Sequence, residues 1–528
     1  MIRPRAQEGT EPATADGAAT GGAGGGSILR RILTYAPSSL VPAALTLATS
    51  MVFTRIFSPA DFGKYSLFLV VAYPVKLMFT TWLTQGIGKF LPPEHTAEGR
   101  RQAKDAIFLS TVLIFVSETV VGAGAFFVAN SLLSPGWQPF LLPVLLFILV
   151  TSIFEILSNV FPAESRAKEY VSYRLFDSIA TMALRLILVS GIFSMDIRLM
   201  FWSVVLSNGV LLPLMWVRAG FPAPTRFAHT LRSKQIRGLA LAFLTFGLPM
   251  TLWLFSSVLL DVGDRFVLNF LLGPAPVGIY DANYRLIAGV AALVVVPITI
   301  TLHPHLMSIS GSGDEERIGH VIGTVVQNLL LVGLLSVGLV FLLHSDLARI
   351  LLGPEFREGS IVMAPVLAGV FLFNIGSFVH KPFEIIGRTR VMVVLGFVAA
   401  AANIAFCFAL IPRVGYVGAA YATLLSYLLY TVGVGALGRR IISWHIDRRM
   451  MLTHGGLICG GLAAIYLLRG VASGLPYAWN LTMTALACCA LASVSLLRLL
   501  RRGAPLTAAR PARVLRRKEA EPGRRPGC

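Results

Sequence analysis

The chain has 528 residues, of which 55% are hydrophobic and 13% are charged, and its mean hydropathy is +0.73. A soluble domain carries about 25% charged residues, so this composition excludes a soluble globular protein and predicts a polytopic membrane protein. The net charge of +19 is explained by Lys and Arg in loops beside apolar runs, where such residues fix orientation and attract anionic membrane lipids. We therefore expect no nucleic-acid partner.

Residues 1–30 are rich in Gly, Ala and Thr and lack an apolar core, which is typical of a disordered tail rather than a signal peptide. The apolar runs that follow are continuous, and backbone polar groups cannot go unpaired in lipid. They therefore predict an all-α protein with about 14 transmembrane helices of roughly 20 residues each. The predicted spans are 36–57, 66–91, 106–129, 138–162, 174–194, 198–217, 238–260, 279–303, 321–343, 361–384, 391–411, 417–437, 451–468 and 477–498.

These spans group into two halves with additions at the end. We predict an N-terminal six-helix lobe at 31–217, a basic linker at 218–237, a C-terminal six-helix lobe at 238–437, two accessory transmembrane helices at 438–500 and a basic tail at 501–528. Lys and Arg concentrate in the loops on the side of both termini. Because such residues are retained in the cytoplasm, both termini are expected to be cytoplasmic.

A short connector between spans occurs twice, at 54–69 and at 269–286. Its matching residues are Pro59, Gly63 and Tyr65 in the first copy and Pro274, Gly278 and Tyr280 in the second. Internal repeats of this kind are typical of transporter folds. We expect the prolines to stop the preceding helices, the glycines to allow a sharp turn through positive φ, and both connectors to act as hinges or gates at the outer face.

Five segments in order carry a family resemblance: SPADFGKYSLFL, GPAPVGIYDANYRL, LLGPEFREGSIVMAPVLAGVFLFNIGSF, EIIGRTRVMVVLGF and LIPRVGYVGAAYATLLSYLL. Together they resemble the polysaccharide flippase branch of the multidrug/oligosaccharidyl-lipid/polysaccharide exporter superfamily. The resemblance implies two pseudo-symmetric six-helix lobes around a central cavity, with two accessory C-terminal helices. It also implies transport of polyprenyl-pyrophosphate-linked oligosaccharides across the plasma (inner) membrane, in a pathway with glycosyltransferases and a polysaccharide polymerase.

Cations deep within predicted spans are the candidates for binding a pyrophosphate, because buried ionisable groups are costly and usually functional. Lys76 lies about 16 Å into the second span at 1.5 Å per residue, and Arg285 lies nearer the outer end of the equivalent eighth span. We expect these two side chains on opposite walls of the cavity, or else paired with carboxylates inside their lobes. Arg185, near the midplane of the fifth span, is the third candidate.

Acidic residues within spans leave two roles open. Glu118 lies at a depth similar to that of Arg185, so it could form a structural ion pair with that residue or couple transport to Na+ or H+. Asp177 is a further candidate for ion coupling, nearer the cytoplasmic face. Asp264 and Arg265, at the predicted outer end of the seventh span, form either a gate that breaks on opening or a clamp on the hairpin.

The chain has no GxxxxGK[ST] loop and no nucleophile elbow, and its five cysteines show no metal or disulfide spacing. We therefore expect no enzyme activity, no metal and no cofactor. A peptidoglycan lipid-precursor flippase and a cation-coupled drug exporter of the same superfamily remain alternatives to the polysaccharide flippase.

Overall fold

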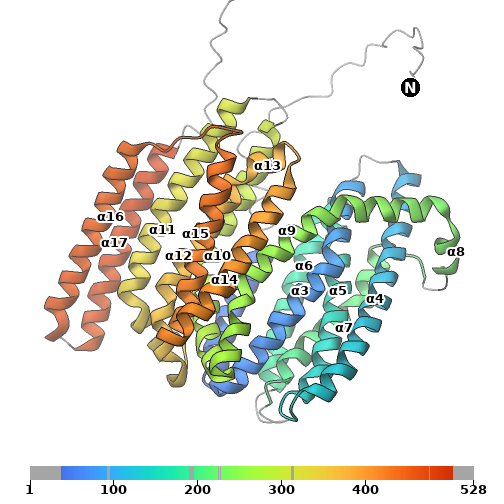
Figure 1. Cartoon of the computed structure of the whole chain (residues 1–528), viewed down its shortest axis with the longest axis horizontal. Helices are drawn as coiled ribbons and strands as arrows, with labels where there is room; N and C mark the ends of the chain where they lie inside the picture. Colours follow the sequence, from blue (N-terminus) through green and yellow to red (C-terminus); the bar gives the residue numbers. More distant parts are fainter. Residues whose placement is uncertain are drawn as a thin grey trace, which may run out of the picture.

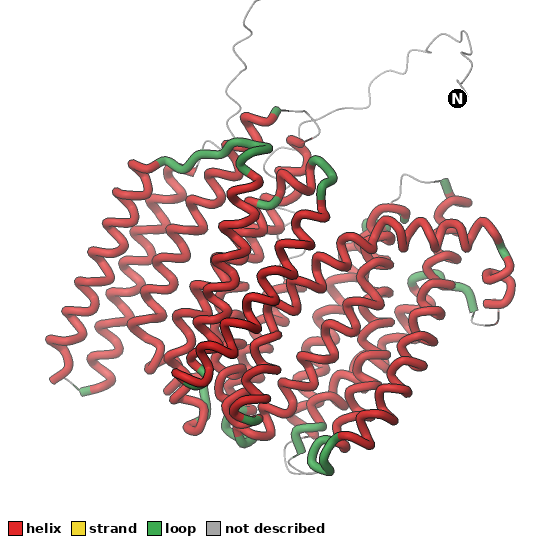
Figure 2. Tube along the Cα trace, in the orientation of Figure 1, coloured by secondary structure: helices red, strands yellow, loops and turns green. Residues whose placement is uncertain are grey.

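The structure is a computed structural model that describes residues 37–91, 96–188, 196–223, 225, 227–310, 314–474 and 476–503. Within these ranges all regular elements are helices, as Figure 2 shows. Eleven of the described helices are long and apolar enough to cross a membrane, which confirms a multi-pass membrane protein. The predicted tail 1–30 and residues 504–528 of the predicted tail 501–528 lie outside the described residues.

The described part of each predicted span lies largely on helices, and eleven of these helices meet the length and hydropathy expected of a membrane span. The first half contains α2 (Pro37–Phe53), α3 (Pro59–Phe90), α4 (Ala97–Leu132), α5 (Leu141–Ala163), α6 (Ala167–Ile187) and α7 (Leu199–Arg218). After α8 (Phe227–Arg232), the second half contains α9 (Lys234–Leu272), α10 (Pro274–Ser310), α11 (Glu315–Leu351), α12 (Met363–Val379), α13 (Lys381–Ile385), α14 (Thr389–Val414) and α15 (Val417–Gly438). The last two helices are α16 (Arg448–Val471) and α17 (Tyr477–Gly503), and short 3₁₀ turns include η4 (Pro354–Val362).

The helices form two lobes. In the N-terminal lobe α5 packs on α3, α4 and α7, and α6 packs on α2 and α7. In the C-terminal lobe α14 packs on α9 and α15, and α12 packs on α11 and α15. Figure 1 shows the first set in blue and cyan on one side and the second in yellow and orange on the other, with α16 and α17 beside α11.

Helix α9 joins the two lobes. Near its start it packs on α3, where a Cβ on Gly247 would lie 2.1 Å from the Trp82 carbonyl oxygen. Its later turns pack on α14 and α10. Pro249 lies between these regions, inside the helix, where a proline removes a hydrogen bond and bends the axis. Figure 1 shows α9 curving from one lobe to the other.

The two connectors contact each other. A Cβ on Gly63 would lie 1.8 Å from the Pro274 carbonyl oxygen, and a Cβ on Gly278 would lie 1.9 Å from the Pro59 carbonyl oxygen. This reciprocal contact brings α3 and α10 together across the lobes, and only glycine permits such a close approach.

Two expectations about the connectors are therefore wrong. The positive-φ glycines among the described residues are Gly220, Gly273, Gly387 and Gly415, and neither connector glycine belongs to this set. Pro59 and Pro274 begin α3 and α10 rather than stopping the helices before them, because the fixed φ of proline suits a first helical turn.

The connector end of the molecule is closed by further contacts between the lobes. The Gly353 N–H donates to the Thr54 hydroxyl at 3.0 Å, and the guanidinium of Arg55 donates to the Ile350 carbonyl oxygen at 2.7 Å. The rings of Phe62 and Phe356 meet edge to face with centroids 5.6 Å apart. The turn after α2 therefore packs on the turn after α11, and a buried apolar cluster spans both lobes at this end.

Candidate functional site

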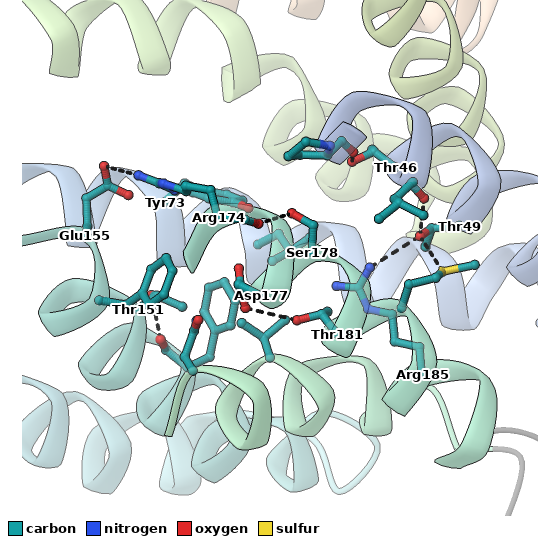
Figure 3. Close-up of a pocket in the computed structure, with 18 of the residues that line it drawn as sticks. Thr46, Thr49, Tyr73, Thr151, Glu155, Arg174, Asp177, Ser178, Thr181 and Arg185 are labelled. Atoms are coloured by element: carbon teal, nitrogen blue, oxygen red, sulfur yellow. Dashed lines mark hydrogen bonds and ion pairs between the residues drawn. The ribbon is translucent and has the colours of Figure 1, made fainter. Parts of the chain in front are cut away.

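A polar cavity of ≈ 470 Å³ lies inside the N-terminal lobe, among α2, α3, α5, α6 and α7. We call it the N-lobe cavity, and Figure 3 shows it. Its ionisable Lys, Arg, Asp and Glu lining residues are Lys76, Glu155, Arg174, Asp177 and Arg185. Three are cationic and two are acidic, so the cavity carries a surplus of positive charge.

Helix α6 supplies most of the polar lining because its polar residues recur on one face. Arg174, Asp177, Thr181 and Arg185 are spaced by three or four residues, so they lie along one side of the helix. Figure 3 shows Arg174, Asp177, Ser178, Thr181 and Arg185 along the cavity wall. This polar face makes α6 less apolar than its neighbours, and it is absent from the eleven candidate spans.

Lys76, Glu155 and Arg174 form one charged group on the cavity wall. Arg174 donates to Glu155 at 2.9 Å, while the Lys76 ammonium lies 4.0 Å from the other Glu155 oxygen. Lys76 also lies 5.6 Å from the centroid of the Tyr73 ring. The single carboxylate of Glu155 is thus shared by Lys76 of α3 and Arg174 of α6. This group of three residues therefore has a net positive charge, which is available to an anion.

Arg185 and Asp177 have separate surroundings on the same wall. The Arg185 guanidinium donates to the Ser203 hydroxyl at 3.2 Å and to the Thr49 hydroxyl at 3.5 Å. Within the described residues it makes no ion pair. Asp177 accepts hydrogen bonds from Ser207 at 2.9 Å and Thr181 at 3.2 Å.

Glu118 does not pair with Arg185, and that structural expectation is wrong. Glu118 is 3% exposed, and its Oε1 accepts a hydrogen bond from the Ser152 hydroxyl at 2.7 Å. Its Oε2 has no hydrogen-bond partner among the described residues. It faces an apolar pocket between α3, α4, α5 and α9 on the far side of α3 from the cavity. Similar depth in the bilayer did not imply contact, because the two side chains lie on different sides of the lobe.

Asp264 and Arg265 lie within α9, fully buried, and not at the end of a span. Arg265 donates to Asp264 at 2.8 Å and to Asp281 of α10 at 3.2 Å. Asp264 also accepts from the Tyr280 hydroxyl at 2.5 Å and from the Thr423 hydroxyl at 2.9 Å. We call this group, with Asp261, Tyr284, Arg285 and Tyr427, the C-lobe network. Its members lie on α9, α10 and α15, so it holds the hairpin in this conformation.

Arg285 belongs to the C-lobe network and is not among the residues lining the N-lobe cavity. It pairs with Asp281 one turn earlier on α10. Tyr65, which lines the cavity, lies on α3, and α3 packs on α10, the helix that carries Arg285. Arg285 is therefore close to the cavity at the boundary between the lobes, while Lys76 and Arg185 line it directly.

The sequence analysis included neither Arg174 nor Glu155 among the candidate site residues. The available signal was the polar periodicity of α6, which begins at Arg174 and leads through Asp177 to Arg185. The pairing of Arg174 with Glu155 joins helices α5 and α6 and has no spacing signature in the chain.

Comparison with solved structures defines the class of the fold. A multidrug resistance MATE family transporter of the MOP superfamily, in an inward-facing conformation, matches with a TM-score of 0.60 and 14% identity, over 77% of this chain and 94% of that one. The lipid II flippase MurJ, in an inward closed conformation, matches with a TM-score of 0.57 and 13% identity, over 89% and 100%. A MOP superfamily transporter from Pyrococcus furiosus gives a TM-score of 0.54 at 12% identity, over 79% and 96%. The fold is that of the MOP transporters.

A family model described as polysaccharide biosynthesis protein matches residues 52–361, which is more than half of the chain. The chain therefore belongs to this family, and the resemblance seen in the sequence is confirmed. No curated protein sequence matches it. The solved neighbours are transporters and a flippase rather than enzymes, in agreement with the expectation that the chain is not an enzyme.

Proposed function

We propose that the protein is a flippase that moves polyprenyl-pyrophosphate-linked oligosaccharides across the plasma membrane for surface polysaccharide synthesis. The N-lobe cavity is the observation that carries this proposal. It offers three cations to an anionic headgroup between α3, α5 and α7, which are apolar enough to cross a membrane. Both termini lie in the cytoplasm in this proposal, because the basic loops lie on their side of the membrane.

The cavity suits a pyrophosphate better than a cation. Arg174 presents a planar guanidinium and Lys76 a mobile ammonium, and both share Glu155. A phosphate oxygen in the cavity would form charge-assisted hydrogen bonds with these two groups. The Lys76 ammonium would then move away from the Glu155 carboxylate and toward the phosphate. Arg185, which donates to the hydroxyls of Ser203 and Thr49, would meet the second phosphate. Arg285 is the nearby cation that could follow when the lobes move.

Release on the outer side would require the closed connector end to open. Gly63 and Gly278 bring the backbones of the two lobes into direct contact there. We propose that this contact separates in the outward-open state, with α9 bending at Pro249 as the lobes rotate. The connectors, with Pro59 and Pro274 at their centre, are in this account the outer gate. The Asp264 and Arg265 pair holds one side of the gate together as it moves.

Coupling to Na+ or H+ belongs to the same proposal. One carboxylate oxygen of Glu118 has no hydrogen-bond partner in the described part of the chain, and Asp177 lines the cavity, so these acids are the candidates for carrying the coupled ion. Glycosyltransferases that build the headgroup and a polymerase that consumes it are the expected partners.

A peptidoglycan lipid-precursor flippase is the second candidate. The specific observation in its favour is that the match to the lipid II flippase covers 89% of this chain, compared with 77% for the MATE transporter. Both candidates handle a lipid-linked pyrophosphate, so the same cavity would serve either. A cation-coupled drug exporter is less well supported, since a cationic substrate would meet a cavity with surplus positive charge.

Reconstitution in liposomes tests the proposal. Purified protein would be given a fluorescent lipid-linked oligosaccharide or lipid II, and the label reaching the opposite leaflet would be measured by quenching. We expect acceleration over protein-free vesicles with the lipid-linked oligosaccharide. No acceleration with this substrate would contradict the proposed function, and acceleration with lipid II alone would favour the second candidate.

The site is tested with a matched pair of variants. Arg174→Gln removes a cavity guanidinium that is 25% exposed and paired with Glu155, and we expect at least a tenfold loss of transport, since a hydrogen bond to a charged group contributes about 1.5–3 kcal/mol. Arg469→Gln removes a 28% exposed guanidinium paired with Asp346, on α16 and outside both lobes. Equal losses in the two variants would argue against the N-lobe cavity as the substrate site.

A further inference from the structure

A second pocket lies outside the N-lobe cavity, at the basic end of the N-terminal lobe. Its volume is ≈ 480 Å³, and it is bounded by the first turns of α4, the corner between α5 and α6, and the segment after α7. Arg100, Arg101 and Lys104 of α4 line one side, and Glu164 and Gly220 lie opposite. We call it the basic pocket.

The cations of the basic pocket differ in whether they have an ion-pair partner. Lys104 pairs with Glu164 at 2.7 Å, and Glu164 also pairs with Arg166 at 3.2 Å. Arg100 and Arg101 make no ion pair within the described residues, although Asp105 lines the same pocket. The groups left without an ionic partner are thus two guanidinium groups and one carboxylate, so the pocket retains positive charge for an anion.

The pocket lies at the level of the lipid headgroups. Helix α4 has 36 residues, about 54 Å at 1.5 Å per residue, while the hydrocarbon core is about 30 Å thick. Its first turns therefore extend beyond the core. Beside the pocket, the Trp216 indole donates to the Pro222 carbonyl oxygen at 3.2 Å and packs edge to face on Phe221, an arrangement typical of the membrane boundary.

Gly220 shapes the wall of the pocket opposite α4. Its φ is +71°, and a Cβ there would lie 3.3 Å from the Lys104 ammonium. Glycine thus lets the chain turn after α7 while leaving Lys104 free to pair with Glu164. Glu164 is engaged by Lys104 in this ion pair, so Arg100 and Arg101 are the pocket cations that remain for a ligand.

We propose that the basic pocket binds a phosphate group, through Arg100 and Arg101, and that its source is an anionic phospholipid of the surrounding leaflet. Guanidinium groups pair with phosphate oxygens in a bidentate manner, and the acyl chains would extend along the lipid-facing side of α4. A soluble phosphate compound would use the same two side chains. This site is separate from the transport cavity and does not depend on the proposed function.

The test measures which lipids stay bound. Full-length protein would be reconstituted in nanodiscs containing equal amounts of phosphatidylglycerol and phosphatidylcholine. After release of the protein from the nanodiscs, the lipid molecules that remain bound to it would be counted by native mass spectrometry. Arg100→Gln with Arg101→Gln should reduce retained phosphatidylglycerol about 25-fold, since each of the two cations contributes about 1 kcal/mol near the surface and about 1.4 kcal/mol is a factor of ten. The control, Arg448→Gln with Arg449→Gln, removes the same charge from the exposed start of α16 and should change retention little.

Three outcomes are decisive. Selective loss of lipid in the first variant, with no displacement of lipid from the wild type by 10 mM inorganic phosphate, supports a lipid headgroup. This phosphate concentration is about a hundred times the Kd of a weak site with a Kd of about 0.1 mM. Displacement of the lipid by that phosphate supports the pocket but assigns it to a soluble anion. Equal loss in both variants, or no loss in either, would overturn the proposal. Unfolding temperatures of both variants within about 1 °C of the wild type, which is about 1 kcal/mol for a chain of this size, ensure that loss reflects binding.

Discussion

The two lobes share a repeat but use their interiors differently. Aligned through the connectors, Ser66, Leu69 and Val70 of α3 correspond to Asp281, Tyr284 and Arg285 of α10, and Lys76 corresponds to Ala291. The N-terminal lobe thus keeps a polar cavity with one deep cation on α3, whereas the C-terminal lobe fills the same region with the C-lobe network. In the proposed account, the first repeat holds the substrate and the second gives the lobe its rigidity.

The difference also concerns how charge is compensated. In the C-lobe network Arg265 is 2% exposed and meets two carboxylates. In the N-lobe cavity Arg174 and Lys76 share one, and Arg185 has none within the described residues. A buried charge that loses its partner is expensive, so the C-terminal lobe is expected to tolerate little change, while the cavity is expected to tolerate substitution at the expense of function.

The largest effect is predicted in the C-lobe network. Arg265→Met would leave Asp264 and Asp281 buried without their shared cation, and we expect a loss of about 3–5 kcal/mol in the free energy of unfolding. Arg174→Met in the N-lobe cavity should lose no more than about 1 kcal/mol, because its side chain is partly exposed. Chemical unfolding in detergent measures both, and similar losses would remove the distinction between the lobes.

The next effect concerns the surface where the lobes meet. Gly278→Ala places a methyl group 1.9 Å from the Pro59 carbonyl oxygen, so the connector end must shift, at a cost of about 1–3 kcal/mol. Gly124→Ala meets nothing within 4 Å and should be neutral or stabilising, since alanine favours helix. Unfolding temperatures compare the two variants. An unchanged Gly278→Ala variant would mean that the connectors are not in contact.

A smaller effect is predicted at Glu118. Glu118→Gln removes a buried charge whose Oε2 has no partner among the described residues, while Ser152 can still donate to the amide oxygen. We expect the free energy of unfolding to stay constant or rise by about 1 kcal/mol. If Glu118 carries the coupled ion, transport by this variant should no longer respond to an imposed H+ or Na+ gradient. A fall in stability with full gradient dependence would contradict both statements.

The smallest effect is predicted where α3 and α9 meet near the basic end. The Lys89 ammonium lies 4.0 Å from the centroid of the Phe246 ring, an exposed contact that contributes about 0.5–1 kcal/mol. Lys89→Met should lower the free energy of unfolding by that amount, and Lys168→Met, on the exposed start of α6, should not change it. Equal shifts would show that α9 is not held to the N-terminal lobe by this pair.

Hydropathy was sufficient to predict the helices, and the matching Pro, Gly and Tyr positions of the two connectors predicted the repeat. The described part of each predicted span lies largely on helices, and the paired connectors meet each other. Continuous apolar runs and repeated Pro and Gly positions are local signals, so both could be recognised in the sequence. The reason for the glycines was not predictable, since close approach of Gly63 and Gly278 to the opposite connector is a property of the assembled lobes. Sequence distance gives no information about such contacts.

The candidate site was predicted only in part. Lys76, Arg185 and Asp177 line the N-lobe cavity as ionisable residues within spans, and their roles stay predictions. Arg174 was missed because it lies near a predicted span end, and Glu118 was placed with Arg185 because both have similar depth. Depth along a helix can be counted from sequence, but the direction in which a side chain points depends on the rotation of the helix in its bundle.

The central claim is that the N-lobe cavity, and not the C-lobe network, holds the substrate headgroup. The most direct measurement compares the binding of a fluorescent lipid-linked oligosaccharide to Arg174→Gln and Arg285→Gln in detergent, with Arg469→Gln as the control. We predict at least a tenfold weaker affinity for Arg174→Gln, about 1.4 kcal/mol, a smaller loss for Arg285→Gln, and none for the control. An unchanged affinity in Arg174→Gln together with a large loss in Arg285→Gln would contradict the account.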